Sequence, residues 1–341
     1  MHLGNAWTAL LAWLSARAAG GTMVLRMEDL DPDRSKERFV RDIPADLAWL
    51  GLDWDEGPDL GGPYGPYRQS ERREYYQRCI DRLALQGLLY PCYCTRAELR
   101  GNPGLRGNSG IPQENGVTEN IPPHDEDADA SPPHAGIARA PHAGETEPVY
   151  AGACLRLTES ALAAYRDAGR AASLRVRVAG ARIAFTDRIC GPTSQNLSDA
   201  CGDFVLRRAD GVHAYQLAVV ADDAAMRVCE VVRGADLLDS TARQIYLYRL
   251  FGWPEPTFAH VPLLVDPDGR RLSKRRGDVD LGLLRERGAA PEMIVGYLAY
   301  KAGLIDAPRN VAPAELIDGF SFGALPHGPV IVQDDWLQTR A

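Results

Sequence analysis

The sequence opens with MHLGNAWTALLAW at residues 1–13, where a His-x-Gly-Asn turn stands directly before a helical pattern. Apolar residues over 5–20 follow the i, i+3, i+4, i+7 spacing of an amphipathic helix. Free N–H groups and the dipole at a helix N-terminus favour phosphate, Gly4 permits close approach, and His2 can donate to a phosphate oxygen. The turn therefore predicts a phosphate site; the alternative is a surface helix with Asn5 as its N-cap.

The composition of the 341-residue chain is that of a globular protein, with 45% hydrophobic and 25% charged residues. Its length allows two or three domains of about 100–200 residues each. No apolar run reaches the ~18 residues of a transmembrane helix, and the start lacks the basic region and cleavage site of a signal peptide. We therefore expect a cytoplasmic protein with no membrane partner, and we expect it to be a monomer.

Beyond the first helix, short β-rich runs alternate with helical patterns, which predicts an α/β fold with a parallel sheet. The expected strands lie in residues 22–31, 173–191 and 203–224. The expected helices lie in residues 41–57, 70–94, 236–251 and 281–303, with Pro291 at the start of the last good helix.

Residues 101–149 differ in kind from the rest of the chain. They hold eight prolines and seven glycines but no Phe, Trp, Tyr or Cys, so they cannot bury enough apolar surface to offset the entropy of ordering. We expect a disordered insertion. Eight acids against two arginines also place most of the net charge of −8 here, which leaves the remainder close to neutral and does not exclude a nucleic-acid partner.

A second basic element lies far downstream, in DPDGRRLSKRRGD at residues 266–278. It packs one lysine, Lys274, and four arginines into seven positions beside turn residues. A loop of this kind can stabilise charge on transferring phosphates. A bare Lys/Arg cluster is also typical of a solvated basic run, and that alternative stays open on the cluster alone.

The cysteines give a third element. Cys92 and Cys94 closely precede the expected insertion, and Cys154 closely follows it, so three thiolates bracket the segment and predict a zinc site. Spacing does not choose the fourth ligand. Tyr150 is adjacent, but its free pKa of ~10 must be pulled down by the metal before it binds as phenolate. Chemically better ligands lie within the insertion, namely His124, His134 and His142.

The alternative to a zinc site is a set of three reduced thiols with no metal. Seven cysteines, an odd number without a secretory signal, argue against a disulfide framework. Four of them show no paired spacing and receive no role: Cys79, Cys190, Cys201 and Cys229.

Together, His-x-Gly-Asn near the start and Arg-Leu-Ser-Lys-Arg at 271–275 resemble the two signatures of class I aminoacyl-tRNA synthetases. Three further segments resemble the glutamyl branch in the right order: VLRMEDLDPDR (24–34), YQLAVVADDA (215–224) and VVRGADLLDSTARQIYLYRLFG (231–252). The resemblance covers nearly the whole chain except 101–149. It implies a Rossmann-like catalytic domain that uses ATP with Mg²⁺ to form glutamyl-adenylate from L-glutamate and then transfers glutamate to RNA.

The resemblance also assigns the glutamate contacts. An amino-acid pocket needs an anion for the α-ammonium and cations or hydroxyls for the carboxylates. Glu28 matches the family's acidic contact, and Tyr215 and Arg233 match its other two, with Arg233 suited to bidentate carboxylate binding. Without the resemblance, Glu28 would be interpreted as a helix-capping or surface acid and Arg233 as part of a structural ion pair.

The remaining assignments follow from the same resemblance. His2, Asn5 and Lys274 match the catalytic positions of the two signatures, and with Gly4 they are the expected ATP contacts. Lys274 should contact the ATP phosphates in the transition state of activation. One subfamily carries a Cys-x-Cys…Tyr-x-x-x-Cys set, which favours Tyr150 as the fourth ligand of one structural zinc.

The expected organisation has four parts. The first half of the catalytic domain is expected at residues 1–90, and the inserted zinc subdomain with its disordered loop at 91–200. The second half of the catalytic domain, with the basic loop, is expected at 201–280. A short helical C-terminal segment follows at 281–341. Family members carry a strand and a turn before His-x-Gly, with an arginine and a serine that contact glutamate, and we expect these to be missing here.

Only 67 residues follow Lys274, against about 100 or more for an anticodon-binding domain. The resemblance is therefore to the truncated branch of the glutamyl-tRNA synthetases, whose RNA partner is tRNA(Asp) bearing queuosine at the wobble position. Three alternatives stay open: the catalytic fragment of a discriminating glutamyl-tRNA synthetase, a catalytically inactive RNA-binding paralogue, and a small-molecule nucleotidyltransferase with the same phosphate turn.

Overall fold

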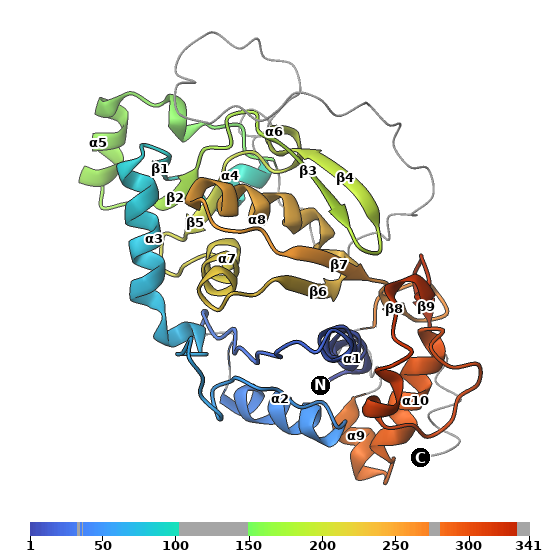
Figure 1. Cartoon of the computed structure of the whole chain (residues 1–341). Helices are drawn as coiled ribbons and strands as arrows, with labels where there is room; N and C mark the ends of the chain where they lie inside the picture. The colour runs from blue at the N-terminus through green and yellow to red at the C-terminus, as the bar shows by residue number, and fades with distance from the viewer. Residues whose placement is uncertain (33–34, 36, 102–148, 273–279, 333–341) are drawn as a thin grey trace.

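The structure of the chain is a computed structural model that describes residues 1–32, 35, 37–101, 149–272 and 280–332 (Figure 1). Nearly all of the expected insertion therefore lies outside the described residues, as does Lys274. In the described ranges no helix has both the length and the apolar character to cross a membrane.

The first helix, α1 (Leu3–Ala18), begins two residues earlier than the pattern predicts, and its N-cap is His2. The alternative in which Asn5 is the cap is wrong, because the cap is the His2 ring: its Nδ1 accepts the Asn5 N–H at 3.3 Å. The Asn5 side chain accepts the His2 N–H in return at 3.5 Å, which completes a capping box. The helix buries one long face, including Trp7.

A parallel strand pair, β6 (Glu230–Gly234) and β7 (Thr257–Val261), lies directly above α1 in Figure 1. Ser15, late in the helix, donates to Glu230 Oε1 at 2.5 Å at the start of β6. Trp7, early in the helix, donates to the carbonyl of Pro262 just beyond the end of β7 at 2.8 Å. The helix therefore runs opposite to the strands, and its N-terminus lies at their carboxyl edge.

The upper part of the molecule in Figure 1 is antiparallel. One three-stranded sheet has the order β1-β2-β5, formed by β1 (Leu89–Cys92), β2 (Ser173–Val176) and β5 (Phe204–Arg207). A hairpin joins β3 (Arg182–Asp187) to β4 (Gly191–Asn196). The pairing of β2 with β5 crosses the expected border at 200–201, and the domain boundaries stay a prediction.

Helices surround these strands, and two of them, α7 and α8, lie between the parallel pair and the upper sheets in Figure 1. The longer helices are α2 (Glu37–Trp49), α3 (Arg73–Leu85), α5 (Glu159–Asp167), α7 (Tyr215–Ala225), α8 (Leu238–Phe251) and α10 (Pro291–Lys301). The short elements are α4 (Arg96–Gly101), α6 (Leu197–Ala200), α9 (Leu281–Glu286) and the parallel pair β8 (Leu264–Val265) with β9 (Val330–Ile331).

Two expected strands are wrong in part. Residues 22–31 form no strand in the described chain and make only single parallel bridges, Val24 to Glu56 and Met27 to Arg68. The second half of the expected strand 203–224 is helix α7. Residues 217–223 of that helix are all buried, so the run lacks the 3.6-residue periodicity that distinguishes a helix from a buried strand.

Helices also end earlier than expected. The helix expected over 41–57 ends at Trp49. The one expected over 70–94 ends at Leu85, and Gly87, with a φ of +71°, turns the chain into β1. The expected helix 281–303 is two helices, α9 and α10, and Pro291 begins the second as predicted.

The α/β class is confirmed, with two large cores. One core joins α1, β7, α9 and α10, and the other joins α3, α7, α8 and the upper strands. Within the described residues, parallel pairing is confined to β6–β7, β8–β9 and three single bridges, the two above and one from Tyr150 to Gly202. A third, small buried cluster lies beside β1: Tyr90, Cys92, Tyr93, Tyr150 and Cys154.

Candidate functional site

The His-x-Gly-Asn turn lies at the carboxyl edge of β6 and β7, where ligands of open α/β sheets bind. A Cβ at position 4 would stand 3.2 Å from two atoms of the His2 ring, so glycine leaves the room that the capping imidazole needs. The backbone of His2 also forms a bridge with Asp280, the first described residue after 273–279. The first described residue after the basic loop therefore lies beside the upstream turn.

Arg233, on β6, is held along one side of its guanidinium. It is only 7% exposed. Its Nε donates to His260 Nε2 at 3.0 Å, and its Nη2 donates to Thr241 Oγ1 at 2.9 Å. Burial lowers the pKa of Arg233, while Tyr215 and Asp223 raise it. The charge is thus desolvated and held in a fixed orientation, which suits it to bind a carboxylate.

Tyr215, the first residue of α7, shares the environment of Arg233 and Glu28. Burial and then the carboxylate of Glu28 raise the pKa of Tyr215 to about 12, while Arg233 opposes the shift. The structure therefore brings together three residues that lie in separate segments of the chain. These are the three residues predicted to contact glutamate.

Arg26 links this group to α7 and was not predicted from the sequence. Its Nη1 donates to Asp223 Oδ1 at 2.6 Å and its Nη2 donates to Glu28 Oε1 at 3.0 Å. Although burial opposes the charge, Asp223 and Glu28 raise the pKa of Arg26. The Glu28 side chain is still 40% exposed, so it is oriented by Arg26 and open to a ligand. The spacing of Arg26 and Glu28 on one side of an extended run was the available signal.

The neighbouring Asp222 anchors α7 to α3. Its side chain is fully buried, and its two oxygens accept from Arg72 Nε at 2.6 Å, Gln69 Nε2 at 2.8 Å and Tyr76 OH at 2.8 Å. A buried carboxylate is tolerated only when it is paired and hydrogen-bonded in this way. Asp222 thus fixes the helix that carries Tyr215 and Asp223.

Behind Arg233 lies a second buried pair. His260 Nδ1 is 2.6 Å from Asp187 Oδ2, and both side chains are fully buried. Oδ1 of Asp187 accepts the backbone N–H groups of His260, Ile189 and Cys190 at 3.1, 2.9 and 2.8 Å. Although burial opposes ionisation, these hydrogen bonds lower the pKa of Asp187, and burial lowers the pKa of His260. The pair is therefore a carboxylate and a neutral imidazole.

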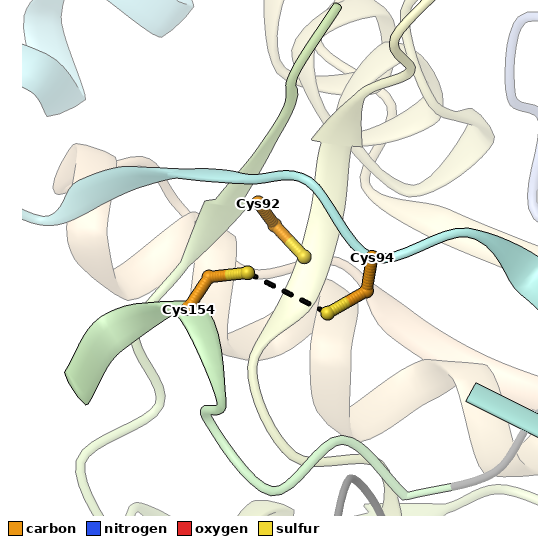
Figure 2. Close-up of side chains that lie close together, drawn as sticks. All are labelled: Cys92, Cys94 and Cys154. Carbon is orange, nitrogen blue, oxygen red and sulfur yellow. Dashed lines mark hydrogen bonds between the residues drawn. The ribbon is translucent and has the colours of Figure 1, made fainter. Parts of the chain in front are cut away.

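Three predicted zinc ligands come together at the end of β1. The Sγ atoms of Cys92, Cys94 and Cys154 lie within 4.8 Å of one another, and those of Cys94 and Cys154 are 3.5 Å apart. Figure 2 shows the three thiols pointing into one space, two from the strand end and one from the turn at Cys154. A tetrahedral zinc with Zn–S bonds of about 2.3 Å separates its sulfurs by about 3.8 Å. The cluster therefore fits such an ion.

Tyr150 directs its hydroxyl to the same cluster. The Tyr150 OH accepts from Cys92 Sγ at 3.4 Å and from the Cys154 N–H at 2.8 Å. The guanidinium of Arg175 lies 3.9 Å from the centroid of the Tyr150 ring and places a positive charge beside it. The histidines considered as alternative ligands, His124, His134 and His142, lie outside the described residues.

The three thiols of the cluster lie so close together that they shift one another's pKa values. The hydrogen bond from Cys154 and the charge of Arg175 lower the pKa of Cys92. Burial and then Cys92 raise the pKa of Cys94, and Cys92 raises that of Cys154. Negative charge on one sulfur thus opposes ionisation of its neighbours, and a bound cation would reduce that penalty. All seven cysteines are free thiols.

The chain matches one protein family over most of its length and is similar to named relatives. Residues 1–131 and 137–317 match the family described as tRNA synthetases class I (E and Q), catalytic domain. The chain is 50% identical to a glutamyl-Q tRNA(Asp) synthetase of Symbiobacterium thermophilum over 97% of this chain and 91% of the relative. It is 45% identical to the enzyme of that name from Nitratidesulfovibrio vulgaris, over 99% and 93%.

Among solved structures, the chain is similar to a glutamate-tRNA synthetase from Elizabethkingia anophelis. The TM-score is 0.75 at 27% identity, and the match covers 99% of this chain and 67% of the other. The similarity thus extends over nearly all of the present chain.

Proposed function

The chain belongs to the class I tRNA synthetases of the glutamate and glutamine branch, and on that premise we propose that it activates L-glutamate with ATP and attaches it to queuosine of tRNA(Asp). The observation that carries the proposal is 50% identity to a glutamyl-Q tRNA(Asp) synthetase over 97% of this chain. The pocket around Arg233 supports it with chemistry suited to an amino acid that has two carboxylates.

Glutamate recognition falls to three residues. Glu28, oriented by Arg26 and open to solvent on its other side, supplies the anion for the α-ammonium. Arg233 supplies the fixed cation for a carboxylate, and the hydroxyl of Tyr215 lies in the same environment. This arrangement leaves the α-carboxylate free to attack the α-phosphorus of ATP, with pyrophosphate as the leaving group.

ATP binding falls to the turn before α1 and to the basic loop. The N–H groups at the start of α1, with His2, Gly4 and Asn5, face the carboxyl edge and favour phosphate. Lys274 supplies positive charge to the phosphates during transfer, with Mg²⁺ accompanying the nucleotide. Lys274 lies outside the described residues, and the bridge from His2 to Asp280 supports its assignment.

The cysteine cluster would hold one structural zinc through Cys92, Cys94, Cys154 and Tyr150. The metal supplies cross-linking between β1 and the turn at Cys154. The proximity of the Tyr150 hydroxyl to Cys92 supports the phenol over the loop histidines as the fourth ligand. Arg175 offsets part of the negative charge that three thiolates and a phenolate would carry.

In the second step, a hydroxyl of the queuosine ring attacks the carbonyl of glutamyl-adenylate and AMP leaves. The direct test supplies labelled glutamate and ATP with tRNA(Asp) that carries or lacks queuosine. We expect stable labelling only of the modified tRNA. Equal labelling of both would contradict the proposal and favour an ordinary glutamyl-tRNA synthetase activity. Glutamate-dependent pyrophosphate exchange without charging of either tRNA would contradict the transfer step and support only the activation of glutamate.

A further inference from the structure

The guanidinium of Arg233 has two hydrogen-bonding edges, and the protein holds the side edge with two short hydrogen bonds. Nε and Nη2 form the side edge, and they donate to His260 Nε2 and to Thr241 Oγ1. These two acceptors are themselves 3.1 Å apart, so they match the spacing of the edge. On the end edge, formed by Nη1 and the outer hydrogen of Nη2, Nη2 makes a long contact to the Leu237 carbonyl at 3.5 Å, so this is the edge that can receive a carboxylate.

This docking works only if His260 Nε2 is an acceptor. An arginine Nε always donates, so Nε2 must carry a lone pair and the single ring proton must sit on Nδ1. Asp187 enforces that choice, because its Oδ2 lies 2.6 Å from Nδ1 and a carboxylate can only accept. Three backbone N–H groups already occupy the other oxygen, so the carboxylate cannot turn away.

We propose that Asp187 and His260 are positioning residues for substrate recognition: the carboxylate fixes the imidazole tautomer, and the imidazole fixes the edge of Arg233 that faces glutamate. The proposal rests on the proposed role of Arg233 as a glutamate contact. Neither residue touches the substrate. Each acts through the next, from Asp187 to His260 to Arg233.

The decisive variant is Asp187→Asn, which keeps the shape and removes the enforced tautomer. The amide of the variant can donate to His260 Nδ1, which moves the ring proton to Nε2. The Nε2–H and the Arg233 Nε–H are then two donors that face each other and cannot form a hydrogen bond. In glutamate-dependent pyrophosphate exchange we expect the KM for glutamate to rise about tenfold, the effect of losing one hydrogen bond to a charged group. The KM for ATP should stay within about twofold, because the phosphate turn is unaffected.

Two variants of His260 distinguish its positioning of Arg233 from its contribution to packing. His260→Gln retains an oxygen that can accept from Arg233, whereas His260→Leu does not, so the glutamine variant should raise the glutamate KM less than the leucine variant. Asp203→Asn is the matched control, because Asp203 likewise accepts hydrogen bonds from a backbone N–H and from a side-chain donor, Tyr90, but lies just before β5 of the upper sheet. It should leave the glutamate KM unchanged. Parallel rises in both KM values for Asp187→Asn would overturn the proposal.

A spectroscopic readout makes the inference independent of activity. In protein labelled with ¹⁵N at histidine, the ring shifts distinguish the two neutral tautomers, and the signal of His260 among seven histidines is assigned by its loss in His260→Gln. We expect Nδ1–H in the natural protein and Nε2–H in Asp187→Asn. An Nε2–H tautomer in the natural protein would overturn the inference. Absence of glutamate-dependent exchange in the presence of the Nδ1–H tautomer would instead contradict the proposed function.

Discussion

The pocket around Arg233 and the cysteine cluster differ in how their charged groups are balanced. In the pocket, Arg26 lies between Asp223 and Glu28, so positive and negative charges alternate within the chain itself. In the cluster, three thiols and a phenol converge, and Arg175 over the Tyr150 ring is the cation beside them. The pocket is therefore organised by charges of the chain itself, whereas the cluster gathers groups that could hold a metal ion.

The largest effect is expected when one thiol is removed from the cysteine cluster. Cys154→Ser replaces one of three converging thiols, so we expect zinc content to fall from about one ion per chain to none. Structural zinc contributes on the order of 10 kcal/mol to folding of small metal sites, so thermal unfolding should also begin at lower temperature. Elemental analysis of protein purified without added metal measures the first effect, and circular dichroism on heating measures the second.

The matched control is Cys229→Ser, because Cys229 is an exposed free thiol outside the cluster. It should keep its zinc and its unfolding temperature. Equal zinc content in the two variants would show that the cluster is not the metal site.

The next largest effect is expected from removing a buried charge pair beside the pocket. Arg72→Met removes the guanidinium that donates to the fully buried Asp222 and leaves that carboxylate with Arg26, whose Nε lies 3.7 Å from Oδ2, as its counter-charge. Such a change costs about 3–5 kcal/mol of folding free energy. Urea unfolding measures it, and Arg41→Met, which removes an exposed arginine paired with Asp42, is the control with little expected loss. Similar unfolding midpoints for both variants would contradict the account of Asp222.

A third effect concerns catalysis without a change in folding. Lys274→Ala should slow glutamate-dependent pyrophosphate exchange by about 10²-fold, since a preorganised charge at the transition state is worth about 3 kcal/mol. The unfolding midpoint should not move. Exchange at the rate of the natural protein would remove Lys274 from the mechanism.

The smallest expected effect sharpens the assignment of the fourth zinc ligand. Replacing His124, His134 and His142 together by Asn should leave zinc content unchanged, because the phenol of Tyr150 already reaches the cluster. Tyr150→Phe should instead weaken zinc retention against a competing chelator. Loss of zinc in the histidine variant would point to the loop as the source of the fourth ligand.

The two sites also differ in how far the sequence predicts them. The cysteines come from two short brackets whose spacing is visible along the chain, so the convergence of Cys92, Cys94 and Cys154 was predicted from the sequence. The partners in the pocket are separated by long intervals: Arg26 and Asp223 lie 197 residues apart, and Arg233 and His260 lie 27 apart. No local pattern pairs them, and only the resemblance to a family identified Glu28, Tyr215 and Arg233.

The errors in the fold have the same origin. Helix α7 was expected as a strand because tertiary burial covers its residues 217–223 on all sides and hides the helical period. Asn5 was the alternative cap of α1 because asparagine is a common N-cap, whereas in the structure the cap is the ring nitrogen of His2. Local propensity located the elements, and packing against distant segments decided their type and their ends.

The most direct test of the proposed function is the position of the glutamate on the charged RNA. After charging queuosine-containing tRNA(Asp) with labelled glutamate, the tRNA is cut so that the anticodon arm separates from the acceptor end. The account predicts that the label stays with the anticodon fragment, and that charging weakens as salt rises because the RNA is held mostly through its phosphates. Label that travels with the 3′ terminus would contradict the account and assign the chain to the ordinary glutamyl-tRNA synthetases.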